Sequence, residues 1–338
     1  MILSLQLLRF IAAFLVLISH IPIGESNLLG EFPGVIGVDI FFVLSGFVMY
    51  RSLRSTKSPF EFFYERCLRI YPLYIVITLC LVGYKLFMGQ IIDISHLATS
   101  ILLIPNYLNG EYIDPIMVLG WTLQYEMFFY CFIAFAKFTN WAELKIILGF
   151  TAFVIGCSVI TNDSLQILNS LMFEFLYGML LCLAYDSKKE IFSYGSGIIA
   201  VIFLIVATPQ ILGTTDDYIS YFAIRVRVIF DSGEYLRSLT WGVYAAMIVF
   251  AFLALGQRIP KILESLIARL GEISYAVYLV QYVVIPFVLI ASPSPLVSTL
   301  TIIFITFLGA YLLTYHFDQP LRRFLKSIRG DNGSSPPA

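Results

Sequence analysis

The N-terminal segment contains the stretch LRFIAAFLVLISH (Leu8–His20), in which an arginine and a histidine interrupt an otherwise apolar sequence. Apolar residues dominate positions 1–22, which is long enough for a membrane-spanning helix. An α-helix turns about 100° and rises about 1.5 Å per residue, so Arg9 and His20 share one face and lie about 16 Å apart along its axis. Because ionisable groups within a membrane are costly, this pair indicates a functional site.

The composition of the 338-residue chain is that of an integral membrane protein. Hydrophobic residues make up 59% of the chain and charged residues 13%, and the mean hydropathy is +0.87. A soluble domain of this length could not bury so much apolar surface. The net charge of −1 provides no basic surface for nucleic acid, so no nucleic-acid partner is expected. The five cysteines follow no metal-binding spacing, so no metal is expected either.

Apolar runs of about twenty residues recur along the chain, which favours helices over the strands of a β-barrel. We therefore predict an all-α membrane protein with one bundle of about ten transmembrane helices. Most of the 21 lysines and arginines fall in connections that a cytoplasmic N-terminus places inside, so both termini are predicted to be cytoplasmic. The predicted spans are 3–23, 33–52, 69–89, 118–137, 142–161, 165–185, 191–209, 236–256, 272–292 and 295–316.

Asp39 lies in the stretch GVDIFFVLSGFVMY, residues 37–50, near the outer end of the second predicted span. This position is close in depth to His20 on the preceding antiparallel helix. A carboxylate there would orient the imidazole for general-base catalysis. Two alternatives remain open: Asp39 caps the start of its helix, and His20 is an interfacial histidine that bonds to a loop.

Arg66 and Arg69 lie in FYERCLRIYPLY, residues 63–74, at the cytoplasmic start of the third predicted span. Because they are three residues apart, they share a helix face. Paired guanidinium groups at a membrane mouth suit phosphate binding. The alternative is the general enrichment of arginine in cytoplasmic loops.

Glu126 lies in WTLQYEMFFY, residues 121–130, several residues deep in the fourth predicted span. Tyr130 follows four residues later on the same face, and Trp121 is predicted at the outer interface. A carboxylate inside a membrane is expensive unless it is paired or protonated, which favours a functional role for Glu126.

These stretches together resemble the acyltransferase-3 family, bacterial multi-pass membrane proteins that acylate carbohydrates. The resemblance implies one membrane domain over residues 1–329. The remaining residues 330–338, GDNGSSPPA, are predicted to form a flexible cytoplasmic tail. Gln281 stands where many members carry histidine. Glutamine cannot exchange a proton near neutral pH, which puts a catalytic role at that position in doubt, so Gln281 is predicted to contact the substrate instead. The resemblance covers nearly the whole chain and rests on LRFIAAFLVLISH, GVDIFFVLSGFVM, FYERCLRIYPLY, WTLQYEMFFY, GEISYAVYLVQY and FDQPLRRFL.

The resemblance also implies a reaction in the bacterial inner membrane, with acyl-CoA, most commonly acetyl-CoA, as donor and a carbohydrate or glycolipid as acceptor. Arg9, Arg66 and Arg69 would hold the donor phosphates. His20, oriented by Asp39, would act as general base or carry the acyl group transiently.

Glu126 would orient the acceptor or support the histidine, with Trp121 and Tyr130 as further substrate contacts. The long outer connections 90–117 and 210–235 would determine acceptor specificity. The alternative function is a polysaccharide exporter of the same fold without acyl transfer, in which the buried charges line a permeation path.

Overall fold

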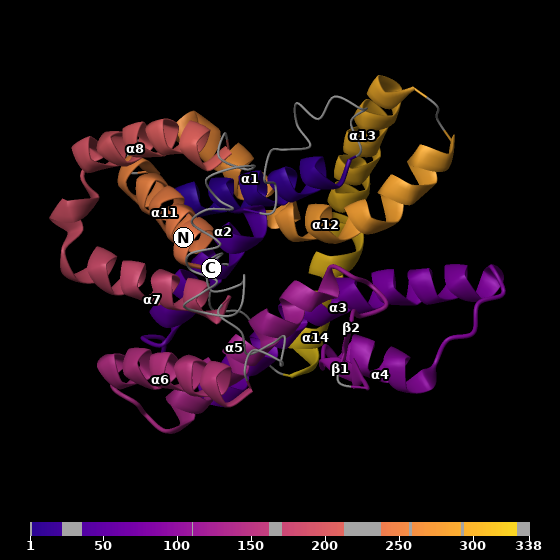
Figure 1. Ribbon diagram of the computed structural model, residues 1–338, viewed down its shortest axis with the longest axis horizontal. Coiled ribbons are helices and arrows are strands. Elements are labelled where there is room, and N and C mark those ends of the chain that lie inside the picture. Colours follow the sequence, from indigo (N-terminus) through magenta and orange to yellow (C-terminus); the bar gives the residue numbers. More distant parts are fainter. Residues whose placement is uncertain are drawn as a thin grey trace.

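A computed structural model describes residues 2–21, 36–109, 111–161, 171–212, 238–256, 259–291 and 294–329 of the chain (Figure 1). The short element η2 is a 3₁₀ helix, and η3 and η5 are π-helical. The elements in chain order are α1 Leu3–His20, α2 Ile36–Ser52, α3 Pro59–Phe87, α4 Ile94–Leu102, β1 Asn106–Leu108, β2 Glu111–Ile113, α5 Gly120–Phe138, α6 Glu143–Thr161, α7 Met172–Ser187, η2 Lys189–Phe192, α8 Tyr194–Leu212, η3 Ser238–Gly242, α11 Val243–Leu255, α12 Lys261–Ala291, α13 Pro295–Leu313, η5 Thr314–Asp318 and α14 Gln319–Ile328.

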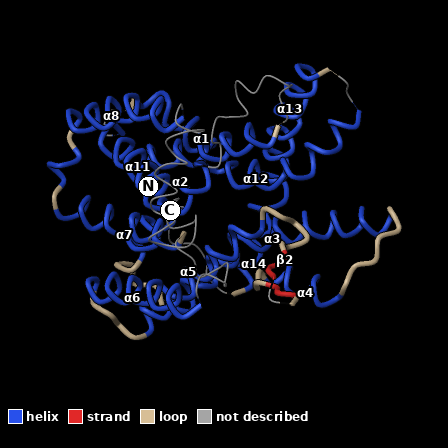
Figure 2. Tube along the Cα trace, viewed as in Figure 1, coloured by secondary structure: helices blue, strands red, loops and turns tan. Residues whose placement is uncertain are grey.

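Besides loops and turns, the described chain consists of helices and one short hairpin (Figure 2), as expected for an all-α membrane protein. Every predicted span overlaps a helix. The number of membrane crossings and the cytoplasmic position of the termini stay predictions. Residues 213–235 of the second long connection and the tail 330–338 lie outside the described residues. Five helical runs in the described chain are long and apolar enough to cross a membrane: Leu3–His20, Pro59–Phe87, Ser238–Leu255, Lys261–Ile290 and Pro295–Ile328.

Two helices begin well before the predicted spans that they contain. The helix α3 starts at Pro59 rather than at residue 69, and α12 starts at Lys261 rather than at residue 272. For α3 the cause is local: the Ser58 hydroxyl accepts a hydrogen bond from the Glu61 N–H at 3.1 Å, and Pro59 occupies the first turn. These are strong signals for a helix start, whereas hydropathy reports only the apolar part of the helix.

The long connection 90–117 contains structure that hydropathy did not reveal. After α4, strands β1 and β2 pair antiparallel with Tyr107 opposite Tyr112. The Tyr112 hydroxyl donates to Oε1 of Gln124 at 2.7 Å, and Nε2 of Gln124 donates to the Ile104 carbonyl at 3.2 Å. The hairpin is thereby attached to the first turns of α5.

The helices α1 and α2 form the centre of the bundle (Figure 1). Helix α1 packs on α2, α11 and α12, and α2 packs on α5, α7 and α11. In Figure 1, α7, α8 and α11 lie on one side of this pair, with α12 and α13 on the other. Most of the length of α1 and α2 is therefore held by neighbours on several sides, whereas His20 lies at the exposed end of α1.

Glycines allow the closest helix contacts. A Cβ atom at Gly46 of α2 would lie 2.1 Å from the Phe175 carbonyl oxygen of α7, and one at Gly178 would lie 2.0 Å from the Val43 carbonyl oxygen. In the same way, a Cβ atom at Gly37 would lie 2.4 Å from a carbonyl oxygen of α1. Small residues at such contacts let backbones approach, which is how membrane helices gain packing energy without a hydrophobic driving force.

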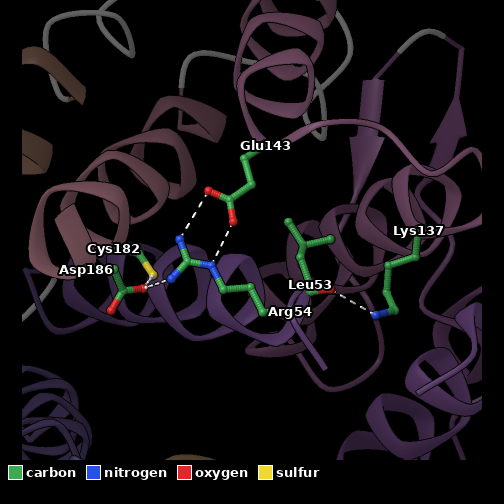
Figure 3. Close-up of polar contacts among 6 residues, drawn as sticks. All are labelled: Leu53, Arg54, Lys137, Glu143, Cys182 and Asp186. Atoms are coloured by element: carbon green, nitrogen blue, oxygen red, sulfur yellow. Dashed lines mark hydrogen bonds and ion pairs between the residues drawn. The ribbon is translucent and has the colours of Figure 1, made fainter. Parts of the chain in front are cut away.

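A polar cluster on Arg54 fixes the end of α2 to two other helices (Figure 3). The Arg54 guanidinium donates to both carboxylate oxygens of Glu143, at 2.7 and 3.1 Å, and to Asp186 at 2.6 Å. The Cys182 thiol donates to the same Asp186 carboxylate at 3.6 Å. Nearby, the Lys137 ammonium donates to the Leu53 carbonyl at 3.4 Å. This cluster joins the end of α2 to α6 and α7 and has a structural role.

Replacing Gly178 by alanine is expected to force α2 and α7 apart and to cost about 1–3 kcal/mol of stability. The matched control is Gly83→Ala in α3, where nothing lies within 4 Å of the added Cβ atom. The control should leave stability unchanged or raise it, because alanine favours a helix by up to about 1 kcal/mol over glycine. Thermal unfolding of both variants in detergent tests this contact. Equal unfolding midpoints for Gly178→Ala and Gly83→Ala would contradict the close packing of α2 against α7.

Candidate active site

A partly open pocket lies between α1, α2, α3, α5 and α12, and it spans about 590 Å³ when the space open to the exterior is included. Its lining is mostly apolar and carries three charged side chains. Charged residues reach it from three different helices: Arg9 from α1, Arg69 from α3 and Glu126 from α5. The complete lining is Arg9, Val38, Phe41, Phe42, Ser45, Arg69, Ile70, Thr122, Leu123, Glu126, Ser274, Tyr275 and Tyr278.

The pocket brings together three of the residues singled out from the sequence. Arg9 and Arg69 were predicted to act together on one ligand, and both line this pocket with Glu126. With two guanidinium groups and one carboxylate, the charged side chains of the lining favour an anionic ligand. Such charges are tolerated within a membrane protein because they face a shared cavity rather than lipid.

Two hydroxyl groups hold the Glu126 carboxylate. The Ser45 hydroxyl of α2 donates to Oε1 of Glu126 at 2.9 Å. The Tyr130 hydroxyl donates to the same oxygen from one turn further along α5, which confirms the predicted shared face of Glu126 and Tyr130. Both donors fix the carboxylate in place, and Ser45 additionally ties it to α2.

Tyrosines of α12 form one wall of the pocket, and sequence reasoning did not single them out. The Tyr275 hydroxyl donates to the Ile70 carbonyl at 2.8 Å. The Tyr278 and Thr122 hydroxyls lie 2.8 Å apart, which links α12 to α5. Their sequence signal is weak because the chain contains 21 tyrosines and tyrosine is generally enriched at membrane interfaces. Ser45 was missed for a similar reason, since a lone serine in an apolar helix looks unremarkable in sequence.

His20 lies apart from this pocket, at the exposed end of α1. Its Nδ1 is 2.7 Å from the Val16 carbonyl oxygen. A carbonyl can only accept, so Nδ1 carries a proton, and in the neutral imidazole Nε2 has the lone pair. This is the tautomer that a general base acting through Nε2 requires.

Asp39 is buried in the first turn of α2. The Nδ1–H group of His20 donates to the Val16 carbonyl oxygen, so at Nδ1 the imidazole is oriented by its own helix rather than by Asp39. That the Asp39 carboxylate orients the His20 imidazole stays a prediction. Among the described residues, Glu126 bonds to Ser45 and Tyr130 rather than to His20.

Arg66, Trp121 and Gln281 lie outside the pocket lining. The Arg66 guanidinium is 5.6 Å from the centre of the Phe62 ring. Trp121 packs edge-on against Phe42, which does line the pocket, with 6.4 Å between the rings. Gln281 is buried, and its Nε2 donates to the Tyr278 carbonyl at 2.9 Å. The predicted roles of these three residues stay predictions.

No cluster of histidine, cysteine, aspartate or glutamate in the described part of the chain has the arrangement of a metal site. The ligand that the pocket chemistry suits is an anion that two guanidinium groups can contact, since paired arginines favour phosphate and carboxylate groups.

Replacing Ser45 by alanine leaves the intramembrane Glu126 carboxylate with one donor fewer, which is expected to cost about 1–3 kcal/mol. The control on the same helix is Ser52→Ala, because the Ser52 hydroxyl donates only within its own helix, to the Met49 carbonyl at 2.6 Å. Thermal unfolding should show a lower midpoint for the Ser45 variant and a wild-type midpoint for the control. A midpoint of S45A equal to that of wild type would mean that this hydrogen bond contributes little.

Comparison with known proteins places the chain in a family. The family described as an acyltransferase domain matches residues 2–315. The exopolysaccharide production protein ExoZ of Rhizobium meliloti is 31% identical over 259 residues, which cover 73% of this chain and 75% of that protein. The acyltransferase MdmB of Streptomyces mycarofaciens is 32% identical over 149 residues, covering 38% of this chain and 37% of that protein.

A third relative, from the Acidianus two-tailed virus, carries the provisional name of an acetyltransferase and is 25% identical over 259 residues, covering 73% of this chain and 72% of that protein. No solved structure matches the chain. The match to the family extends over all five helices that line the pocket. The chain therefore belongs to the acyltransferase-3 family and is a membrane-bound O-acyltransferase.

Proposed function

We propose that this enzyme transfers an acyl group, most simply acetyl, from cytoplasmic acyl-CoA to a hydroxyl of a cell-surface or exported polysaccharide or glycolipid. The observation that carries the proposal is the pair of guanidinium groups, Arg9 and Arg69, in one pocket inside the bundle. The name of the relative ExoZ, an exopolysaccharide production protein, supports the acceptor class. The proposed location is the inner membrane of a bacterium.

The pocket suits the anionic part of the donor. Guanidinium groups bind phosphate with two parallel hydrogen bonds, and Arg9 and Arg69 approach from different helices. Glu126 lies in the same lining and would keep the arginines oriented before the donor enters. Arg66 is one turn before Arg69 on α3 and would attract phosphates from outside the lining.

His20 would serve the transfer step. Along α1, His20 lies about 16 Å from Arg9, a distance that an extended thioester arm would bridge. Nε2 would take the proton of the acceptor hydroxyl while its oxygen attacks the thioester carbonyl carbon. The carbon–sulfur bond then breaks, and the proton passes to the leaving thiolate, which gives an ester and free coenzyme A.

A two-step route uses the same groups. Nε2 would attack the thioester directly, release coenzyme A and pass the acyl group from the imidazole to the acceptor. This route allows coenzyme A release without acceptor, which direct transfer does not. Asp39 would stabilise the positively charged imidazole in either route.

Replacing His20 by alanine is expected to abolish ester formation on the cell-surface polysaccharide, because loss of a general base or nucleophile lowers the rate by about 10²–10⁴-fold or more. The matched control is His316→Ala, which removes an exposed histidine of η5 outside the pocket lining. Ester content is measured by alkaline release of the acyl group from polysaccharide of cells with equal amounts of each variant in the membrane.

Full ester content with the His20 variant would disprove the role of this histidine while leaving the family assignment intact. Unchanged ester content in cells without the enzyme, combined with a loss of exported polysaccharide, would favour the exporter instead. Release of coenzyme A by the wild type without acceptor would identify the two-step route.

A further inference from the structure

The C-terminal helix α14 extends beyond the apolar part of the bundle. Together α13, η5 and α14 form one helical run of 34 residues, Pro295–Ile328. Such a run is about 51 Å long, whereas the hydrocarbon core of a bilayer is about 30 Å thick. Once α13 has crossed the core, α14 therefore lies at the level of the lipid headgroups or beyond it.

Helix α14 exposes apolar side chains on one face. Phe324 and Ile328 are four residues apart on the same face and are 60% and 68% exposed. Phe60, in the first turn of α3, is 70% exposed, and the guanidinium of Arg329, the residue after Ile328, is 5.1 Å from its ring centre. These three exposed side chains belong to two helices that meet at Arg329, and they are here called the apolar patch.

Another side of α14 is held by α3. The Tyr64 hydroxyl donates to the Leu325 carbonyl at 3.3 Å, and the Lys326 ammonium pairs with Glu65 at 3.4 Å. The Arg329 guanidinium also lies 4.8 Å from the Tyr64 ring centre. These contacts fix the rotation of α14, so Phe324 and Ile328 stay on its outer face.

Basic side chains lie next to the apolar patch. Two of the carboxylates on these elements are paired with other cations: Asp318 with Arg322, and Glu65 with Lys57 and Lys326. Within the part of the chain that the structure describes, neither Arg323 nor Arg329 forms an ion pair.

An apolar patch next to unpaired cations at headgroup level matches the surface of an anionic bilayer. We propose that Phe60, Arg323, Phe324, Ile328 and Arg329, here called the α14 surface, bind anionic phospholipid at the leaflet next to the start of α3. The apolar side chains enter the boundary between headgroups and acyl chains, and the guanidinium groups contact lipid phosphates. This contact would hold α14 on the membrane beside the pocket-bearing helix α3.

The test places a fluorescent probe in the α14 surface. The full-length variant Phe324→Trp is reconstituted into nanodiscs that contain phosphatidylcholine and phosphatidylglycerol in fixed proportion, with brominated acyl chains on only one of the two lipids. The emission of the natural tryptophans, measured on the wild type, is subtracted. Quenching of the new indole should be stronger when phosphatidylglycerol is brominated. The reason is that each arginine should raise the local concentration of phosphatidylglycerol about fivefold.

Two variants complete the test. Adding Arg323→Gln and Arg329→Gln to the probe variant should remove the preference and leave quenching by both lipids. Phe304→Trp, at a 66% exposed position within α13, should be quenched equally by both lipids because it faces acyl chains. Equal quenching of the Phe324→Trp probe by the two lipids, or no quenching by either, would overturn the proposal. Equal thermal unfolding midpoints of all variants show that the fold is intact.

Discussion

The cost of charge inside a membrane is the constraint on which the arrangement of this enzyme depends. Arg9, Arg69 and Glu126 belong to three helices that are otherwise rich in apolar residues, and a bilayer provides no water to solvate them. Their side chains can be accommodated only if α1, α3 and α5 turn them toward one common cavity. This requirement fixes the rotation of the three helices and creates a site for an anion at the same time.

Close helix packing makes that cavity rigid. Gly46 and Gly178 let α2 and α7 approach until backbone and side chain fill the interface, and Gly37 does the same between α2 and α1. Helix α2 then carries Ser45 to the Glu126 carboxylate. A donor bound in the pocket would meet groups whose positions are set before it arrives, which lowers the cost of ordering them on binding.

The sequence predicted the helices, and it singled out three residues that line the pocket, Arg9, Arg69 and Glu126, because both leave local signals. Apolar runs gave the spans, and the four-residue spacing of Glu126 and Tyr130 gave their common face. The true start of α3, set by Ser58, and the hairpin around Tyr107 lie in polar segments that hydropathy does not interpret. The bond between Ser45 and Glu126 joins residues 81 positions apart, and only the packed bundle brings them together.

The central claim is that Arg9 and Arg69 bind the phosphates of the acyl donor, and the most direct test is the affinity for coenzyme A without acceptor. Calorimetry on purified protein would compare the wild type with Arg9→Gln and Arg69→Gln, and with Arg323→Gln, which changes an exposed arginine outside the pocket lining. The account predicts that each pocket variant raises the dissociation constant about tenfold or more, because a charged hydrogen bond contributes about 1.5–3 kcal/mol, while the control retains wild-type affinity. Wild-type affinity in both pocket variants would contradict the account.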